Sequence, residues 1–204
     1  MNRRPLVVGN WKMHGTSAFA GDLSRAIGVG AAVLPNLDIA ICPPYLLLSA
    51  VAAELTASAV KLGAQTVSEF DQGAYTGETP AANLVAAGCH YVIVGHSERR
   101  NIFGETDDAV AAKARAASAA GLTPIICVGE KLAQRADGTT NDVISAQLAP
   151  FVRLGTAAFS SVVVAYEPVW AIGTGETASP EQAQEVHAFI RASIRAVDVS
   201  AADS

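Results

Sequence analysis

Three side chains with useful chemistry follow three separate apolar runs in the sequence: an amine, an imidazole and a carboxylate. Lys12 comes after the first run, His96 after the fourth and Glu167 after the sixth. The carboxyl ends of parallel strands carry the chemistry of α/β proteins, so these groups are expected to meet at one edge of a sheet. Such a trio suits proton transfer next to the carbonyl group of an anionic substrate. Taken singly, each is more typical of a surface charge, a helix cap or a loop acid, and only the shared position favours catalysis.

The elements that must position these groups are six short apolar runs separated by longer, Ala-rich stretches. Each run is about five residues long and too continuous for a strand with one solvated face, which predicts parallel strands buried on both faces. The runs are Leu6–Trp11, Ile39–Cys42, Val60–Ala64, Tyr91–Val94, Pro124–Val128 and Val162–Tyr166.

The stretches between the runs carry helix signals. Ser179, Pro180 and Gln182 form a capping box with proline at the first helical position. The apolar face that follows is Ala183, Val186, Ile190, Ile194 and Val197, at helical spacing. A second helix is predicted to begin near residues 106–108, with acids in its first turn. Six such strand–helix units without a linker predict one domain over residues 1–204, with right-handed crossovers. The alternation of apolar runs and helical stretches does not by itself decide between a doubly wound open sheet and a barrel.

Composition narrows the possible partners and cofactors. Of the 204 residues, 50% are hydrophobic, and the net charge of −5 comes without any basic run, which argues against nucleic acid and membrane surfaces as partners. Three cysteines without C-x-x-C spacing predict reduced thiols in a cytoplasmic protein. The four histidines lack the spacing of metal ligands, so no metal is expected. The sequence shows no targeting segment and no apolar stretch long enough to span a membrane.

Several segments of the sequence resemble the signature segments of the triosephosphate isomerase family, in the same order along essentially the whole chain. They are Gly9–Met13, Gly63–Gln65, Tyr75–Glu78, Gly95–Arg100, Cys127–Glu130 and Ala165–Gly175. The resemblance implies an α/β fold, a parallel (β/α) barrel of the TIM type, of which six of the eight βα units are present.

The resemblance also implies an activity, the interconversion of dihydroxyacetone phosphate and glyceraldehyde 3-phosphate, in glycolysis and gluconeogenesis, without a cofactor. Position by position, Glu167 is then the base that moves the proton and His96 is the neutral electrophile that polarises the carbonyl. Lys12 stabilises the enediolate and the phosphate. The remaining implied roles are substrate binding by Asn10 and Gly173, and support of the catalytic group by Ser97 and by Glu98, the latter through Lys12.

Two loops also take roles from the resemblance. Residues 168–178 are expected to close over the substrate as a lid that includes Pro168, Val169, Trp170, Ala171, Ile172, Gly173, Thr174 and Gly175. The loop of Tyr75, Thr76, Gly77 and Glu78 is expected to reach a neighbouring subunit, which makes the full-length form a homodimer. On local evidence alone this second loop is simply a turn.

The sequence departs from the family pattern in three places. His14 stands where a small amide is common, and Glu176 stands where a lid lysine is common. The chain is also expected to stop before the seventh and eighth units, with their glycine-rich phosphate loops, as a truncated reading frame or as a genuine shortened form. The alternative to an isomerase is therefore an inactive remnant that serves as a binding or interaction module. An oxidoreductase interpretation of Gly173–Ala178 is disfavoured because that glycine motif does not join a strand directly to a helix.

Overall fold

The computed structural model describes residues 3–159 and 161–203, which fall into two compact units. The amino-terminal unit comprises residues 3–94 and 113–124, and the carboxy-terminal unit comprises residues 95–112, 125–159 and 161–203. The expectation of a single domain over residues 1–204 stays a prediction.

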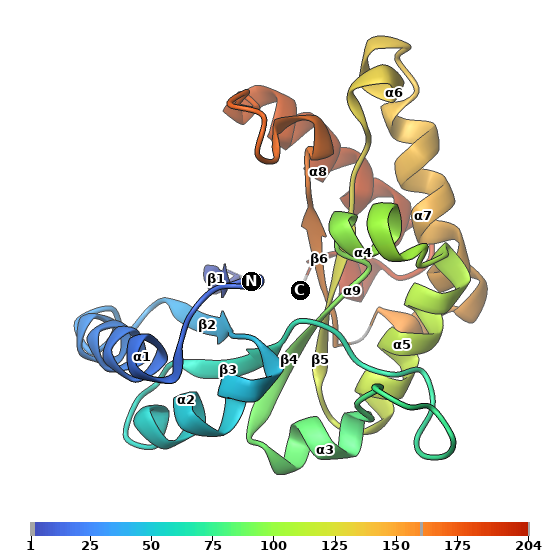
Figure 1. Cartoon of the computed structure of the whole chain (residues 1–204). Coiled ribbons are helices and arrows are strands. Elements are labelled where there is room, and N and C mark those ends of the chain that lie inside the picture. Colours follow the sequence, from blue (N-terminus) through green and yellow to red (C-terminus); the bar gives the residue numbers. More distant parts are fainter. Residues whose placement is uncertain (1–2, 160, 204) are drawn as a thin grey trace. The chain divides into compact units, whose positions relative to one another are not determined.

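The amino-terminal unit contains a sheet of four parallel strands in which each strand pairs with its neighbour in the sequence (Figure 1). The strands are β1 (Leu6–Asn10), β2 (Asp38–Cys42), β3 (Lys61–Ala64) and β4 (Cys89–Val94). In the first pair Leu6 lies opposite Asp38 and Asn10 opposite Cys42, so the carboxyl ends of β1 and β2 are level. This register brings the residues that follow the two strands to the same edge of the sheet.

Helices connect these strands. They are α1 (Ser17–Ala31), the short 3-10 helix η1 (Tyr45–Leu47), α2 (Leu48–Leu55) and α3 (Ala81–Ala86). The first helix begins where the hydroxyl of Thr16 accepts a hydrogen bond from the backbone of Phe19. It packs on α2, which in turn packs on β3. The apolar side chains of Val51 and Leu62 are buried in this unit, where they form part of its core.

The carboxy-terminal unit is built around the parallel pair of β5 (Thr123–Val128) and β6 (Val163–Tyr166). The pairing runs from Ile125 opposite Val163 to Val128 opposite Tyr166, and again the two strands end level. The residues at 129 and 167 therefore follow directly at the same edge.

The helices of this unit include two long ones, α7 and α8, that pack on each other, and α8 also packs on β6 (Figure 1). Their bounds are α4 (Ser97–Phe103), α5 (Asp107–Ala119, whose last residues belong to the other unit), α6 (Leu132–Ala136), α7 (Thr140–Leu154), η2 (Thr156–Ala158), η3 (Val169–Ala171), α8 (Pro180–Arg195) and α9 (Val199–Asp203). None of the helices within the described residues is long and apolar enough to cross a bilayer.

The predicted capping box of the last long helix is confirmed. Ser179 accepts a hydrogen bond from the backbone of Gln182 at 3.2 Å, and the Gln182 side chain accepts one from the backbone of Ser179 at 2.9 Å. The predicted apolar face is buried at Val186, Ile190 and Ile194. The helix expected near residues 106–108 begins at Asp107.

The prediction that all six strands are buried on both faces is wrong for the first and the last. β2 to β5 are buried toward their carboxyl ends, but every described residue of β1 and β6 is at least partly exposed, and Val7 is 54% exposed. Each of these two strands pairs with one neighbour among the described residues, so one edge lacks a covering strand. The apolar composition of a strand reports its β-propensity, whereas its burial depends on the neighbours it acquires.

Candidate active site

The imidazole of His96 sits at the amino end of α4, where it caps the helix. Its Nδ1 accepts a hydrogen bond from the backbone N–H of Glu98 at 3.2 Å. A ring nitrogen that accepts carries no proton, so this contact assigns the proton of the neutral ring to Nε2. The Glu98 carboxylate lies further from the same nitrogen, at 3.5 Å. The helix cap therefore leaves Nε2 as the hydrogen-bond donor of the ring.

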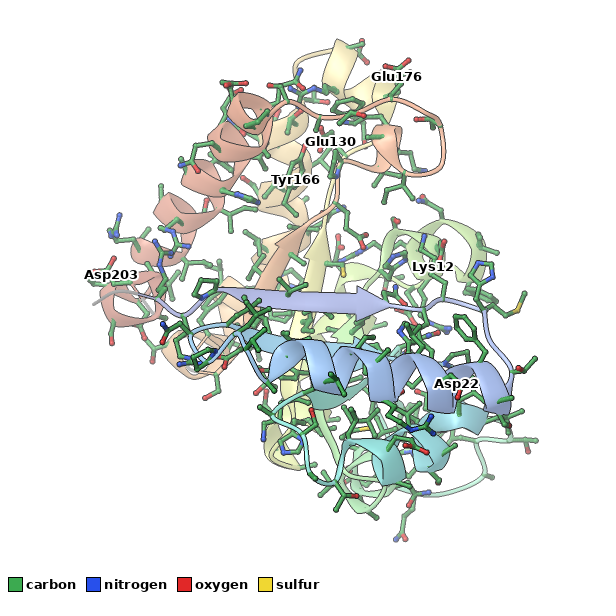
Figure 2. All side chains as sticks on the ribbon, turned by 90° about the vertical axis from the view of Figure 1, so that its left-hand side faces the viewer. Lys12, Asp22, Glu130, Tyr166, Glu176 and Asp203 are labelled. Atoms are coloured by element: carbon green, nitrogen blue, oxygen red, sulfur yellow. The ribbon has the colours of Figure 1, made fainter. Side chains whose placement is uncertain are left out.

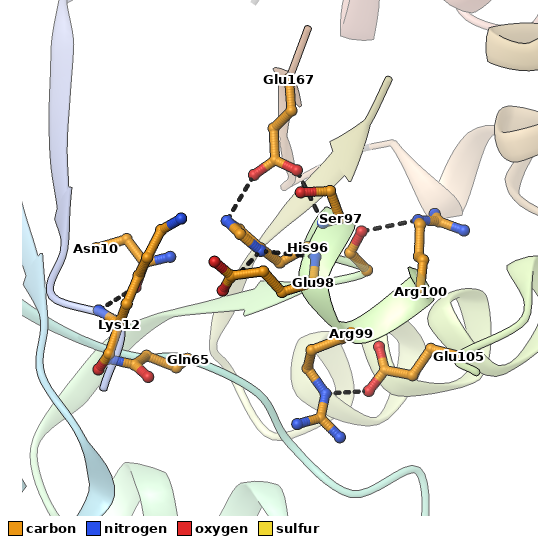
Figure 3. Close-up of polar contacts among 11 residues, drawn as sticks. Asn10, Lys12, Gln65, His96, Ser97, Glu98, Arg99, Arg100, Glu105 and Glu167 are labelled. Carbon is orange, nitrogen blue, oxygen red and sulfur yellow. Dashed lines mark hydrogen bonds and ion pairs between the residues drawn. The ribbon is translucent and has the colours of Figure 1, made fainter. Parts of the chain in front are cut away.

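That donor points at the carboxylate of Glu167, which follows β6 directly (Figure 3). Glu167 Oε1 lies 3.0 Å from His96 Nε2, and Glu167 Oε2 accepts a hydrogen bond from the backbone N–H of Ser97 at 2.9 Å. The side chains of His96 and Glu167 are only 9% and 16% exposed. The carboxylate is thus shielded from bulk water and oriented at both oxygens, beside an imidazole N–H.

Arg100 fastens the loop that carries His96 to the rest of the carboxy-terminal unit. Its guanidinium donates hydrogen bonds to the carbonyls of Gly95 at 2.7 Å and Cys127 at 3.3 Å, and it forms an ion pair with Asp107. Gly95 has a φ of 68°, and a Cβ there would lie 2.7 Å from a methyl group of Val110. Both the left-handed backbone and the close packing require glycine at this turn.

A cavity of about 300 Å³ lies beside Glu167 within the carboxy-terminal unit. Its lining is more apolar than polar in area, and its polar side chains include Ser97, Arg100, Lys131 and Gln147. The volume is at the lower end of the range for small-molecule sites. The carboxylate therefore borders a space large enough for a small molecule.

A buried glutamate holds the start of the segment expected to form the lid. Glu130 is 0% exposed, and its Oε1 accepts hydrogen bonds from Trp170 Nε1 at 2.9 Å and from the Tyr166 hydroxyl at 3.0 Å. The guanidinium of Arg135 lies 3.2 Å from the same oxygen and also stacks over the Trp170 ring. Figure 2 shows Glu130 and Tyr166 in this part of the molecule. The carboxylate thus ties the 3-10 helix η3 to the end of β6 and to α6.

The pKa of Tyr166 is raised to about 12, first by burial and then by the hydrogen bond to the Glu130 carboxylate and by its charge. The phenol therefore stays protonated and remains a donor at neutral pH.

The middle of the predicted lid is exposed and rich in glycine. Gly173 and Gly175 have φ values of 70° and 86°, a conformation that favours glycine, and residues 173–177 are solvent-exposed. The Thr174 hydroxyl donates to the Trp170 carbonyl at 2.8 Å and accepts from the backbone of Glu176 at 3.2 Å. Figure 2 shows Glu176 at the outer end of the segment. The segment thus combines a well-held start with an open, adaptable tip.

A second group of polar residues lies in the amino-terminal unit, around the backbone of Lys12 (Figure 3). Asn10 Oδ1 accepts a hydrogen bond from the backbone N–H of Lys12 at 3.0 Å. Gln65 Nε2 donates to the carbonyl of Lys12 at 2.8 Å and to that of Cys42 at 2.9 Å. Lys12 has a φ of 51°, the one non-glycine residue with positive φ among those described. Such strain persists only where neighbours fix it, and it is concentrated at functional sites.

The structure therefore brings the predicted site residues together in two groups. His96, Ser97, Glu98 and Glu167 meet in the carboxy-terminal unit, and Asn10 and Lys12 meet in the amino-terminal unit. The convergence of Lys12 with the first group stays a prediction.

Sequence reasoning missed the roles of Glu130, Gln65 and Gln147, because each acts through long-range contacts of one side chain. For Glu130, the sequence offered one signal, an acidic residue two positions after an apolar run.

The predicted dimer loop is an exposed turn of the amino-terminal unit. The backbone of Glu78 donates to the carbonyl of Tyr75 at 3.0 Å, Gly77 has a φ of 94°, and the Tyr75 ring stacks on Phe70 with centroids 4.0 Å apart. The backbone of Ser68 donates to the carbonyl of Thr79 at 2.8 Å and closes the base of the loop. Its role in a dimer stays a prediction.

The three cysteines, Cys42, Cys89 and Cys127, are buried thiols outside any disulfide in the part of the chain that the structure describes. Burial raises the pKa of the Cys42 thiol to about 12 and that of Cys89 to about 11, so both stay protonated and unreactive at neutral pH. Within residues 3–159 and 161–203, no group of three or more His, Cys, Asp or Glu side chains is arranged to hold a metal ion.

Comparison with known proteins identifies the family. The family model described as triosephosphate isomerase matches residues 5–204. A triosephosphate isomerase of Dechloromonas aromatica is 53% identical over 202 residues, which cover 98% of this chain and 81% of the relative. That of Halorhodospira halophila is 54% identical over 198 residues (96% and 78%), and that of Coxiella burnetii is 50% identical over 206 residues (100% and 81%). The parallel strands and this match show an α/β fold of the TIM-barrel type. The chain therefore belongs to the triosephosphate isomerase family of enzymes.

Proposed function

We propose that the protein interconverts dihydroxyacetone phosphate and glyceraldehyde 3-phosphate by proton transfer through an enediolate, without a cofactor. The observation that supports this best is the 3.0 Å contact between His96 Nε2 and Glu167 Oε1, with Nδ1 occupied by the Glu98 backbone N–H. A base and a neutral hydrogen-bond donor thereby lie side by side, as removal of a proton next to a carbonyl requires. This family is itself the standard example of such a neutral histidine.

In the proposed reaction, Glu167 takes a proton from the carbon next to the substrate carbonyl. The electron pair of the broken C–H bond forms the carbon–carbon double bond of the enediolate, and the carbonyl oxygen becomes negative. The Nε2–H of His96 donates to that oxygen and stabilises the developing charge. Glu167 then returns its proton to the neighbouring carbon, while the hydroxyl proton moves from one oxygen to the other. Atoms and charge are thus the same in substrate and product.

Substrate binding is assigned to Asn10, Lys12 and Gly173. The ammonium of Lys12 is suited to a phosphate or an enediolate oxygen because it is a compact charge on a long stem. Asn10 supports it by accepting from the Lys12 backbone. The backbone at Gly173 is open to a phosphate because no Cβ stands in the way.

Residues 168–178 act as a lid in this proposal. The exposed tip with Gly173 and Gly175 supplies the freedom to close, while Trp170, bonded to the buried Glu130, holds the start of the segment. Closure removes water from around the enediolate and so prevents loss of its phosphate. Loop closure is itself a standard feature of this family.

The wider setting of the enzyme follows from the same assignment. Its substrate is a phosphorylated triose, its reaction serves glycolysis and gluconeogenesis, and its full-length form is a homodimer that uses the exposed loop of residues 75–78. The three thiols are not in disulfides, which fits a reducing compartment, so the cytoplasm is the proposed location.

Turnover in a coupled assay tests the proposal, with Glu167→Gln as the decisive variant. This change keeps the shape of the side chain and removes the base, so kcat should fall by roughly 10³–10⁴-fold, the upper part of the range for general-base catalysis. Glu185→Gln is the matched control, since that acid lies exposed in the middle of α8. A folded chain without turnover, or a fully active Glu167→Gln variant, would contradict the isomerase assignment. The first result would favour a binding module instead.

A further inference from the structure

We infer that Gln147 and Gly129 are positioning residues for Glu167. Gln147 clamps both backbone groups of Gly129, and the backbone of Gly129 in turn fixes the main chain of Glu167. The inference rests on the proposed role of Glu167 as the base.

Gly129 lies against the backbone of Glu167 more closely than any other residue type permits. A Cβ built on Gly129 would lie 1.7 Å from the Glu167 carbonyl oxygen and 2.8 Å from its carbonyl carbon. On the other side of the same residue, the backbone N–H of Glu167 donates to the carbonyl of Val128 at 2.7 Å. Both backbone polar groups of Glu167 thus face residues 128–129, the last residue of β5 and the one that follows it. Any displacement of residues 128–129 displaces the base.

That stretch is held from outside by one side chain of α7. Gln147 Oε1 accepts a hydrogen bond from the Gly129 backbone N–H at 2.8 Å, and Gln147 Nε2 donates to the Gly129 carbonyl at 3.0 Å. A primary amide has a donor and an acceptor side by side, so it satisfies both groups of one residue. A carboxylate lacks the donor, and an aliphatic side chain lacks both.

The clamp is mounted on a rigid support. The neighbouring positions on α7, Ile144, Leu148 and Phe151, are all nearly or fully buried in the core of the carboxy-terminal unit. Gln147 therefore projects from a helix whose position is fixed by apolar packing. The core thus fixes α7, Gln147 of α7 fixes Gly129, and Gly129 fixes the backbone of Glu167.

Precise placement matters here because the carboxylate has two partners at once. Glu167 Oε1 meets His96 Nε2 and Oε2 meets the Ser97 N–H, at 3.0 Å and 2.9 Å. A shift of the Glu167 backbone stretches both contacts and moves the base away from the substrate carbon. Misplacement by about 1 Å is enough to cost on the order of 10²-fold in rate.

Replacing the amide by a side chain of similar length tests the clamp. Gln147→Met should lower kcat by roughly 10–100-fold, because the base is misplaced, while KM changes less than kcat because the residues assigned to substrate binding, Asn10, Lys12 and Gly173, are unchanged. In protein labelled with ¹⁵N-histidine, the Nε2–H signal of His96 should shift or broaden, since its hydrogen bond to Glu167 is weakened. The signal is assigned with His96→Asn. The control is Ile144→Val, which weakens the core of the same helix without touching Gly129.

The outcomes separate this inference from the proposed function. A folded Gln147→Met protein with wild-type kcat and an unchanged His96 signal overturns the clamp, as does an equal loss of kcat in Ile144→Val. If Gln147→Met does not fold, Gln147→Glu, which keeps the acceptor and lacks the donor, takes its place with the same criteria. If the wild-type chain has no turnover, the proposed function fails. The His96 signal then still decides whether Gln147 orients the carboxylate.

Discussion

In the carboxy-terminal unit, hydrogen bonds fix the side-chain atoms of the proposed catalytic residues Glu167 and His96. In the amino-terminal unit, the hydrogen bonds described fix the main chain of Lys12. Both oxygens of Glu167 and both ring nitrogens of His96 lie within contact distance of named partners. Around Lys12, the contacts from Asn10 and Gln65 go to the main chain. Proton transfer over a short distance requires a fixed carboxylate. For a lysine that attracts a phosphate, hydrogen bonds to the main chain fix the point from which its long side chain reaches.

After Glu167→Gln, the largest expected effect concerns the imidazole of His96. In His96→Asn the amide oxygen can still accept from the Glu98 backbone and cap α4, but the Nε2–H donor is gone. The loss of one preorganised donor to a developing oxyanion is expected to lower kcat by about 10²–10³-fold. Thermal unfolding should change little, and steady-state kinetics supply the measurement.

The matched control for this variant is His90→Asn, an exposed histidine of β4. Equal losses in the two variants would sink the assignment of His96. A large drop in stability for His96→Asn alone would mean that the ring acts in the structure and not in the reaction.

Substitutions of Gln65 and Gln147 test the difference between the two units. Gln65→Leu removes the donor to the carbonyls of Lys12 and Cys42, and because the Cys42 carbonyl keeps the backbone N–H of Trp11, stability should fall by only about 0.5–1.5 kcal/mol. Because the proposed task of Lys12 is to bind the phosphate, KM should rise more than kcat falls. Gln147→Met is expected to do the reverse. Denaturant unfolding and kinetics on both variants give the test, and the same split between kcat and KM in both would remove the distinction between the two regions.

The strands and the caps could be predicted from the sequence because their causes are local. β5, for example, runs from Thr123 to Val128 against a predicted Pro124–Val128, and Ser179 and Gln182 form the expected capping box. Apolar runs and capping residues act within a few positions, so a linear pattern contains the information. The same locality placed His96 and Glu167 after their strands.

The supports of the site could not be predicted in this way. Gln65 reaches Lys12 across 53 positions and Gln147 reaches Gly129 across 18, and a lone glutamine has no periodicity that announces its partner. Glu130 belonged to a recognised motif, yet its complete burial depends on Tyr166 and Trp170 arriving from β6 and η3. The burial of β1 was predicted wrongly for the same reason, since neighbours decide it.

The smallest expected effect is the part of the alkaline pH dependence of stability that Tyr166 of the carboxy-terminal unit contributes. The pKa of Tyr166 is raised from an ordinary 10.0 to about 12 by burial and by Glu130. Between these two values the folded state keeps a proton that the unfolded state loses. The stabilisation is therefore complete below about pH 10 and is lost as the pH rises toward about 12. Urea unfolding across this range should show a falling stability that is flatter in Tyr166→Phe and unchanged in Tyr75→Phe, an exposed tyrosine of the other unit. Equal slopes in the wild type and Tyr166→Phe would show that the pKa of Tyr166 is not raised in the folded state, which would contradict both the burial of the phenol and its hydrogen bond to Glu130.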